Sequence, residues 1–139
     1  MVTVEYDHEF PYTHDDYGKL FPRLTLQLSN PSNEEQAVDL DAYLDSGAEM
    51  SLFDGSLSEI LGLDLLSGEE WSFVSTAGRA LTARLHRIRI VHPVLGTFDL
   101  NVGFSTAGIS RNLLGRDFFA RIQIGFREHQ SVVYMTAQP

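Results

Sequence analysis

The chain has 139 residues, of which 43% are hydrophobic, and its formal net charge at pH 7 is −9. This length and apolar content predict one folded domain with a buried core, and they exclude a disordered chain. The acidic charge argues against nucleic acid as a partner, because phosphate recognition needs clustered Lys and Arg. The sequence contains no cysteine, which excludes disulfides and catalysis by a thiolate.

The first residues do not resemble a targeting signal. Residues 1–8 read Met-Val-Thr-Val-Glu-Tyr-Asp-His and lack a basic start followed by an apolar segment. No apolar run reaches the length of about 20 residues that a membrane-spanning helix needs. We therefore expect a cytoplasmic protein, or a soluble domain of a larger one, with no membrane partner.

An N-terminal segment is expected over residues 1–20. Residues 2–6 alternate in polarity and are expected to form a short edge strand, whereas residues 7–19 are polar and predict a solvated loop. This loop contains His8 and His14, which raises the alternative of a metal site. The loop interpretation is preferred and no metal is expected, because no histidine pair has a recognised ligand spacing.

The remaining residues, 21–135, are expected to form the domain. Apolar and polar residues alternate in several short segments that turn signals separate, which is typical of an all-β, barrel-like domain. A short helix is expected over 55–61, between Asp54 and Gly62. Strands are expected over 21–28, 36–44, 97–104, 112–114, 121–126 and 131–135, with a long hairpin over 71–90.

The most informative stretch is the end of the second of these strands. Apolar Leu40, Ala42 and Leu44 alternate with polar neighbours, and Asp45-Ser46-Gly47 then breaks the strand. We expect a carboxylate presented on a turn between apolar segments, where its surroundings can tune it for acid–base chemistry. The alternative is an ordinary turn, in which Asp, Ser and Gly are all common.

A second motif far downstream favours the catalytic interpretation. The two segments are Tyr43-Leu44-Asp45-Ser46-Gly47-Ala48 and Leu113-Leu114-Gly115-Arg116-Asp117-Phe118. Together they resemble the retropepsin-like aspartic proteases, and the resemblance covers roughly residues 21–135. It implies an all-β retropepsin-like barrel with one or two short helices, and a peptide hydrolase without a cofactor.

The resemblance also implies a homodimer. An aspartic protease needs two carboxylates, one ionised and one protonated, which share a proton because both cannot ionise at about 3 Å separation. This chain has one Asp-Ser-Gly. We therefore expect an aspartic endopeptidase in which Asp45 of each subunit lies at the two-fold axis and activates water.

Further roles follow from the matched positions. By resemblance, Ser46 would hydrogen-bond across the dimer, Gly47 would contact the substrate backbone, and Ala48 and Leu113 would line side-chain pockets. Arg116, beside Gly115, would join the short helix to the active-site loop and the interface through a carboxylate. Glu49 stands where retroviral relatives carry that carboxylate, next to bound substrate.

The hairpin over 71–90 has a tip of small residues, Ser75, Thr76, Ala77 and Gly78. In the family that the chain resembles, a hairpin at this place is a flap that closes over bound peptide; the alternative is a plain surface hairpin. Four arginines in and after the hairpin suggest a nucleic-acid groove or a solvent-facing strand surface, and the acidic chain favours the latter. They are Arg79, Arg84, Arg87 and Arg89.

The sequence also bears on three other functions. A module with the same fold could bind peptides or assemble a complex without cleaving them, because fold does not determine function. A metal-dependent hydrolase using the scattered histidines is the weaker alternative. A serine hydrolase is not expected, because residues 103–107, Gly-Phe-Ser-Thr-Ala, lack the final glycine of the nucleophile elbow.

Overall fold

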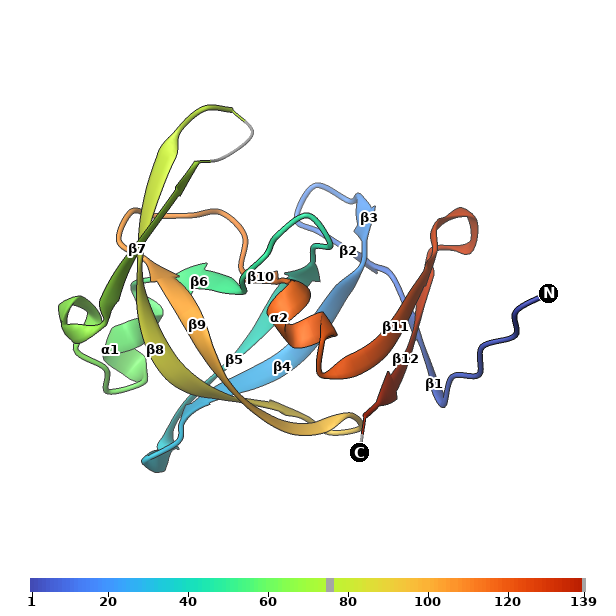
Figure 1. Cartoon of the computed structure of the whole chain (residues 1–139), viewed down its shortest axis with the longest axis horizontal. Helices are drawn as coiled ribbons and strands as arrows, with labels where there is room; N and C mark the ends of the chain where they lie inside the picture. The colour runs from blue at the N-terminus through green and yellow to red at the C-terminus, as the bar shows by residue number, and fades with distance from the viewer. Residues whose placement is uncertain (75–76, 139) are drawn as a thin grey trace.

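A computed structural model describes residues 1–74 and 77–138. Most of these residues lie in strands, with two four-residue helices and two short 3₁₀ turns (Figure 1). In chain order the elements are β1 (His8–Pro11), β2 (Thr13–His14), β3 (Leu20–Phe21), β4 (Arg23–Asn30), β5 (Asn33–Leu44), β6 (Leu52–Asp54), α1 (Leu57–Ile60), η1 (Leu65–Ser67), β7 (Glu69–Val74), β8 (Ala80–His92), β9 (Gly96–Ser105), β10 (Leu113–Leu114), α2 (Arg116–Phe119), β11 (Ile122–Arg127), η2 (Glu128–Gln130) and β12 (Val132–Ala137).

The main sheet has seven strands in the order β4-β5-β10-β6-β9-β8-β7. A further antiparallel pairing joins β4 to β8, where Leu28 lies opposite Ile90, so that the sheet curls back on itself. This pairing closes the sheet into the barrel expected from the sequence, and closure leaves fewer exposed strand edges. Beyond the barrel, β7 and the start of β8 project as a hairpin (Figure 1).

A separate three-stranded sheet, β1-β12-β11, joins a strand near the N-terminus to the last two strands of the chain (Figure 1). The expected strand over residues 2–6 is wrong: the pairing strand is β1, which lies opposite Val132–Met135 of β12. The expected loop over 7–19 is wrong for the same reason, since it contains β1 and β2. The backbone partner of β1 is more than 120 residues away, and local alternation does not reveal such a partner.

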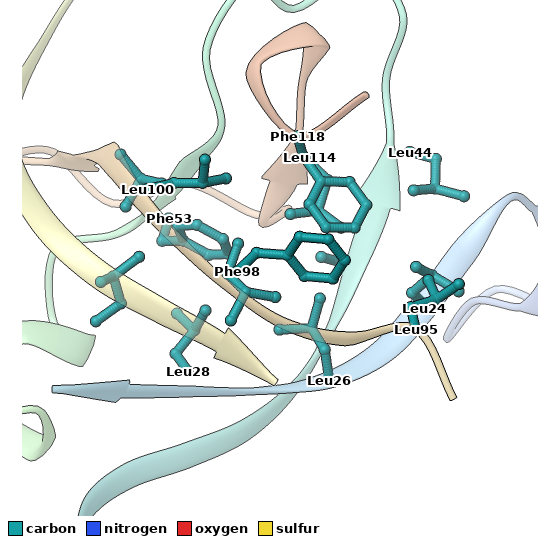
Figure 2. Close-up of a cluster of buried hydrophobic side chains, with 14 of the residues drawn as sticks. Leu24, Leu26, Leu28, Leu44, Phe53, Leu95, Phe98, Leu100, Leu114 and Phe118 are labelled. Carbon is teal, nitrogen blue, oxygen red and sulfur yellow. The ribbon is translucent and has the colours of Figure 1, made fainter. Parts of the chain in front are cut away.

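The core lies between the barrel walls and α2 (Figure 2). Alternate residues of β4 point inward, as the alternation of its apolar residues predicts. Phe118 of α2 is fully buried, and its ring packs edge-on against Phe98 of β9 with centroids 5.2 Å apart. Burying a ring of this size contributes about 1.5–3 kcal/mol. The short helix α2 is therefore held in place by the core and not by its own length.

The other predicted elements are largely confirmed. The strands over 21–28, 36–44, 97–104, 121–126 and 131–135 correspond to β3–β4, β5, β9, β11 and β12, and the expected helix is the shorter α1. The buried strand over 112–114 is β10. No helix in the described part of the chain is long and apolar enough to cross a membrane.

Candidate active site

Asp45 directly follows β5, at the point where three strands meet. Short β10 lies between β5 and β6, parallel to the former and antiparallel to the latter. The backbone N–H of Asp45 donates to the carbonyl of Leu114 at 2.9 Å. Two residues earlier, the N–H of Tyr43 donates to the carbonyl of Asn112 at 2.8 Å. The backbone of Asp45 is therefore anchored from β10, although the residue itself lies outside regular structure.

The turn after β5 is organised by the Asp45 carboxylate. Its Oδ1 accepts the backbone N–H of Gly47 at 2.8 Å, and the N–H of Ala48 donates to the Asp45 carbonyl at 3.2 Å. A Cβ on Gly47 would lie 3.2 Å from Asp45 Oδ1, so the glycine allows the carboxylate to approach closely. Asp45 is half-buried, whereas Ser46 is exposed. Within the described chain the Ser46 hydroxyl makes no hydrogen bond.

The far end of this loop is tied to α2 by Ser51 and Asp117. The Ser51 N–H donates to both Asp117 carboxylate oxygens at 3.0 Å, and its hydroxyl donates to Oδ1 at 2.7 Å. The same hydroxyl accepts the N–H of Gly115 at 3.0 Å. Sequence reasoning did not find this link. The acidic residue after Gly-Arg was the available signal, but its partner is 66 residues away.

Gly115 and Arg116 bring α2 against the active-site loop. A Cβ on Gly115 would lie 2.6 Å from the carbonyl oxygen of Ala48, so only glycine fits at this contact. The Arg116 N–H donates to the same oxygen at 2.8 Å. The Arg116 side chain is exposed, and in the described residues it forms no ion pair with Glu49. Within this chain, Asp117 makes the connection between α2 and the active-site loop that was expected from the arginine side chain.

Asp45 opens into a cavity of about 420 Å³ beneath the β7–β8 hairpin. The structure brings together five predicted site residues there: Asp45, Gly47, Ala48, Glu49 and Leu113. The rest of the lining was not predicted: three residues directly follow Glu49, and strand pairing brings the other four from the hairpin. It consists of Met50, Ser51, Leu52, Trp71, Phe73, Val74 and Leu81.

The hairpin contributes apolar side chains to this cavity. Trp71 and Val74 of β7 line the cavity and are 42% and 71% exposed, so the hairpin presents apolar surface there. Ala77 and Gly78 of the expected tip are exposed and do not line the cavity; Gly78 has a φ of 78°, which favours glycine. Ser75 and Thr76 lie outside the described residues.

Arg84 and Arg89 of the hairpin bind neighbouring groups of the protein. Arg84 donates to the carbonyls of Leu66 and Gly68. Arg89 pairs with Asp99 at 2.9 Å and also with Glu34. The hydrogen bond from Arg89 lowers the pKa of the Asp99 carboxyl. These contacts are consistent with the solvent-facing strand surface that the sequence favoured for these arginines.

The histidines do not form a cluster suited to a metal. In the described part of the chain, no group of three or more His, Asp or Glu side chains could hold a metal ion. His14 is exposed, and His92 is buried, where its Nδ1 accepts the N–H groups of Val94 and Leu95 at 3.2 and 3.1 Å. Burial and the nearby charge of His8 lower the pKa of His92.

The barrel with its projecting hairpin matches solved structures. A retropepsin-like aspartic protease from Rickettsia conorii aligns with a TM-score of 0.59 and 17% identity, over 99% of this chain and all of the other. The chain has a retropepsin-like fold. EIAV protease, solved with the inhibitor HBY-793, aligns with a TM-score of 0.50 and 16% identity, over 72% of this chain and 86% of the other. No family model and no curated protein matches the sequence.

The retropepsin-like fold confirms the fold class inferred from the two motifs. At these identities the likeness concerns the fold, and function has to be argued from the site itself. The site offers the Asp45 carboxylate on a turn held by backbone hydrogen bonds, a cavity that Glu49 also lines, and an apolar hairpin above the cavity. Ser46 and Arg116 present side chains to the exterior beside this site.

Proposed function

We propose that this protein is an aspartic endopeptidase that acts as a homodimer. The observation that carries the proposal is the position of Asp45, half-buried at the end of β5 and open to a cavity of about 420 Å³ under an apolar hairpin. A carboxylate held in this way can take a proton from a bound water, and the cavity offers room for substrate side chains.

The chemistry requires a second carboxylate facing the same water. The ionised Asp45 accepts a proton from water while the water oxygen forms a bond to the peptide carbonyl carbon. The protonated Asp45 of a second subunit donates its proton to the carbonyl oxygen. The resulting tetrahedral intermediate collapses: a hydroxyl proton returns to a carboxylate, the nitrogen takes the other proton, and the C–N bond breaks. No metal or cofactor is needed for this balance.

The dimer is supported by side chains that have no partner in one subunit. The Ser46 hydroxyl is exposed next to Asp45 and makes no hydrogen bond among the described residues. The Arg116 guanidinium is exposed on α2 and forms no ion pair there. Both groups lie in the loop–helix unit that carries Asp45, where a two-fold partner would meet them.

The hairpin is expected to act as a lid over bound peptide. Trp71 and Val74 present apolar surface toward the Asp45 loop, and closure over a peptide would remove that surface from water. Exclusion of water would also strengthen the electrostatic effect of the two carboxylates on the bound peptide.

The test is cleavage of a diverse peptide library from about pH 4 to 7, comparing the wild type with Asp45→Asn. Asp39→Asn is the matched control, because Asp39 is an exposed carboxylate on β5, the strand that leads to Asp45. We expect cleavage that Asp45→Asn lowers at least about 100-fold and Asp39→Asn leaves intact. A dimer that binds peptides and never cleaves them would overturn the proposal in favour of a peptide-binding module.

A further inference from the structure

The side chain of Arg111 lies over two aromatic rings that contact each other. Its Cζ lies 4.6 Å from the ring centroid of Phe21 and 4.5 Å from that of Tyr43. The two rings also contact each other edge-on, with centroids 5.4 Å apart. Stacking of this kind holds the planar guanidinium in one place while its edge N–H groups can still donate hydrogen bonds.

Tyr43 places this arginine close to Asp45. Tyr43 lies opposite Leu113 in the parallel pairing of β5 with β10, so their side chains lie on the same face of the sheet. Leu113 lines the cavity into which Asp45 opens. Arg111 itself precedes Asn112, whose carbonyl accepts the Tyr43 N–H. The guanidinium therefore lies over a ring that neighbours the cavity residue Leu113.

The positive charge of Arg111 is not neutralised by an ion pair. In the part of the chain that the structure describes, Arg111 is exposed and has no carboxylate within ion-pair distance. Its neighbour Arg23 differs, since it pairs with Asp41 at 2.6 Å.

The carboxylate of Asp15, on the adjacent β2–β3 turn, accepts hydrogen bonds from the backbone of that turn. It accepts the N–H groups of Tyr17 and Lys19 at 2.9 Å. The pKa of Asp15 is lowered chiefly by the Lys19 bond, and the charge of Arg111 lowers it further. The positive charge of Arg111 therefore acts on Asp15. Among the described residues, no side chain accepts a hydrogen bond from the guanidinium of Arg111.

We propose that Arg111 is a specificity-determining residue that binds the carboxylate of an Asp or Glu side chain in the substrate, close to the bond that is cleaved. The inference rests on the proposed protease function and names its substrate class. A fork of N–H donors fixed by two rings suits a planar carboxylate. Glu49 lines the cavity proper and repels an acidic side chain there, so the rim at Arg111 is the place for it.

The inference is tested with peptides that the wild type cleaves. Each residue within three positions of the cleaved bond is replaced by Glu and, in a matched peptide, by Gln. We expect kcat/KM for the Glu peptide to exceed that of its Gln partner at least about tenfold at one or more positions. In Arg111→Gln the Glu and Gln peptides should be cleaved equally well, and cleavage of the Gln peptides should be retained. Arg111→Glu should cleave a peptide with Lys at the same position faster than its Gln partner.

Arg121→Gln is the matched control, because Arg121 is also an exposed arginine over a ring, that of Phe98, and lines a different cavity. It should keep the Glu preference. Equal Glu-to-Gln ratios in the wild type and Arg111→Gln would overturn the inference and leave the protease function intact. Thermal unfolding of each variant shows whether it is folded.

If the wild type cleaves no peptide, the proposed protease function is wrong. Peptide binding then tests whether Arg111 recognises a carboxylate. The probe is a pair of fluorescein-labelled hexapeptide pools that differ only in Glu or Gln at every position, measured by anisotropy. Tighter binding of the Glu pool that Arg111→Gln abolishes and Arg121→Gln retains would support Arg111 as a carboxylate site. Equal binding of the two pools would overturn it.

Discussion

The carboxylate of Asp117 accepts hydrogen bonds from both the N–H and the hydroxyl of Ser51, which joins α2 to the loop after Asp45. Ser51 is fully buried and its hydroxyl also accepts the Gly115 N–H. The loop that carries the candidate catalytic carboxylate is thus anchored to β10 at its start and to α2 at its end.

Ser51→Ala should destabilise the protein. The substitution leaves the buried Gly115 N–H without its acceptor and removes one donor from Asp117, at a cost of about 1–3 kcal/mol in the free energy of unfolding. Urea unfolding measures this loss. Ser32→Ala, in an exposed turn, is the control and should be neutral. Equal stability of the two variants would show that the Ser51 hydroxyl is dispensable.

Gly115→Ala should also destabilise, through a steric clash. The new Cβ would lie 2.6 Å from the Ala48 carbonyl oxygen and 2.9 Å from the Met50 carbonyl carbon, so the loop and α2 would have to separate. We expect a loss of about 1–3 kcal/mol in thermal or urea unfolding. Gly108→Ala is the matched control, because a Cβ there meets no atom within 4 Å. If both glycines tolerate alanine equally, the close contact is not needed.

Trp71 should report on peptide binding. It is the single tryptophan of the chain, it lines the cavity, and it is 42% exposed. A bound peptide should cover the indole and shift its fluorescence to shorter wavelength, because the ring leaves water. Trp71→Ala should lower kcat/KM about tenfold through lost apolar contact. Val94 is an exposed apolar residue outside this cavity, so Val94→Ala should leave kcat/KM unchanged. An equal loss of kcat/KM in both variants would contradict a role of the hairpin in peptide binding.

His92 should make stability depend on pH. Burial, and then the charge of His8, lower its pKa in the folded state, so the unfolded chain binds the proton more readily. The resulting stabilisation is present above the ordinary histidine pKa and is lost as the pH falls below it. Between about pH 7 and 5, the free energy of unfolding should fall more in the wild type than in His92→Asn. His129→Asn, at an exposed position, should retain the wild-type slope.

The sequence by itself was enough to predict the barrel strands and the position of Asp45. Alternating apolar residues mark β4, β5 and β9, because each buries one face, and this periodicity is a local property. The Asp-Ser-Gly and Gly-Arg-Asp segments indicated the fold through resemblance. Both signals lie within a few consecutive residues.

Only the tertiary structure decided which distant residues meet at the site. Ser51 and Asp117 are 66 residues apart, β1 pairs with a strand at the other end of the chain, and Trp71 reaches the Asp45 cavity from the hairpin. The stacking of Arg111 on Phe21 and Tyr43 likewise joins three separate segments. Such contacts depend on strand order and register, which the packing of the whole core selects, and no local pattern of residues specifies them.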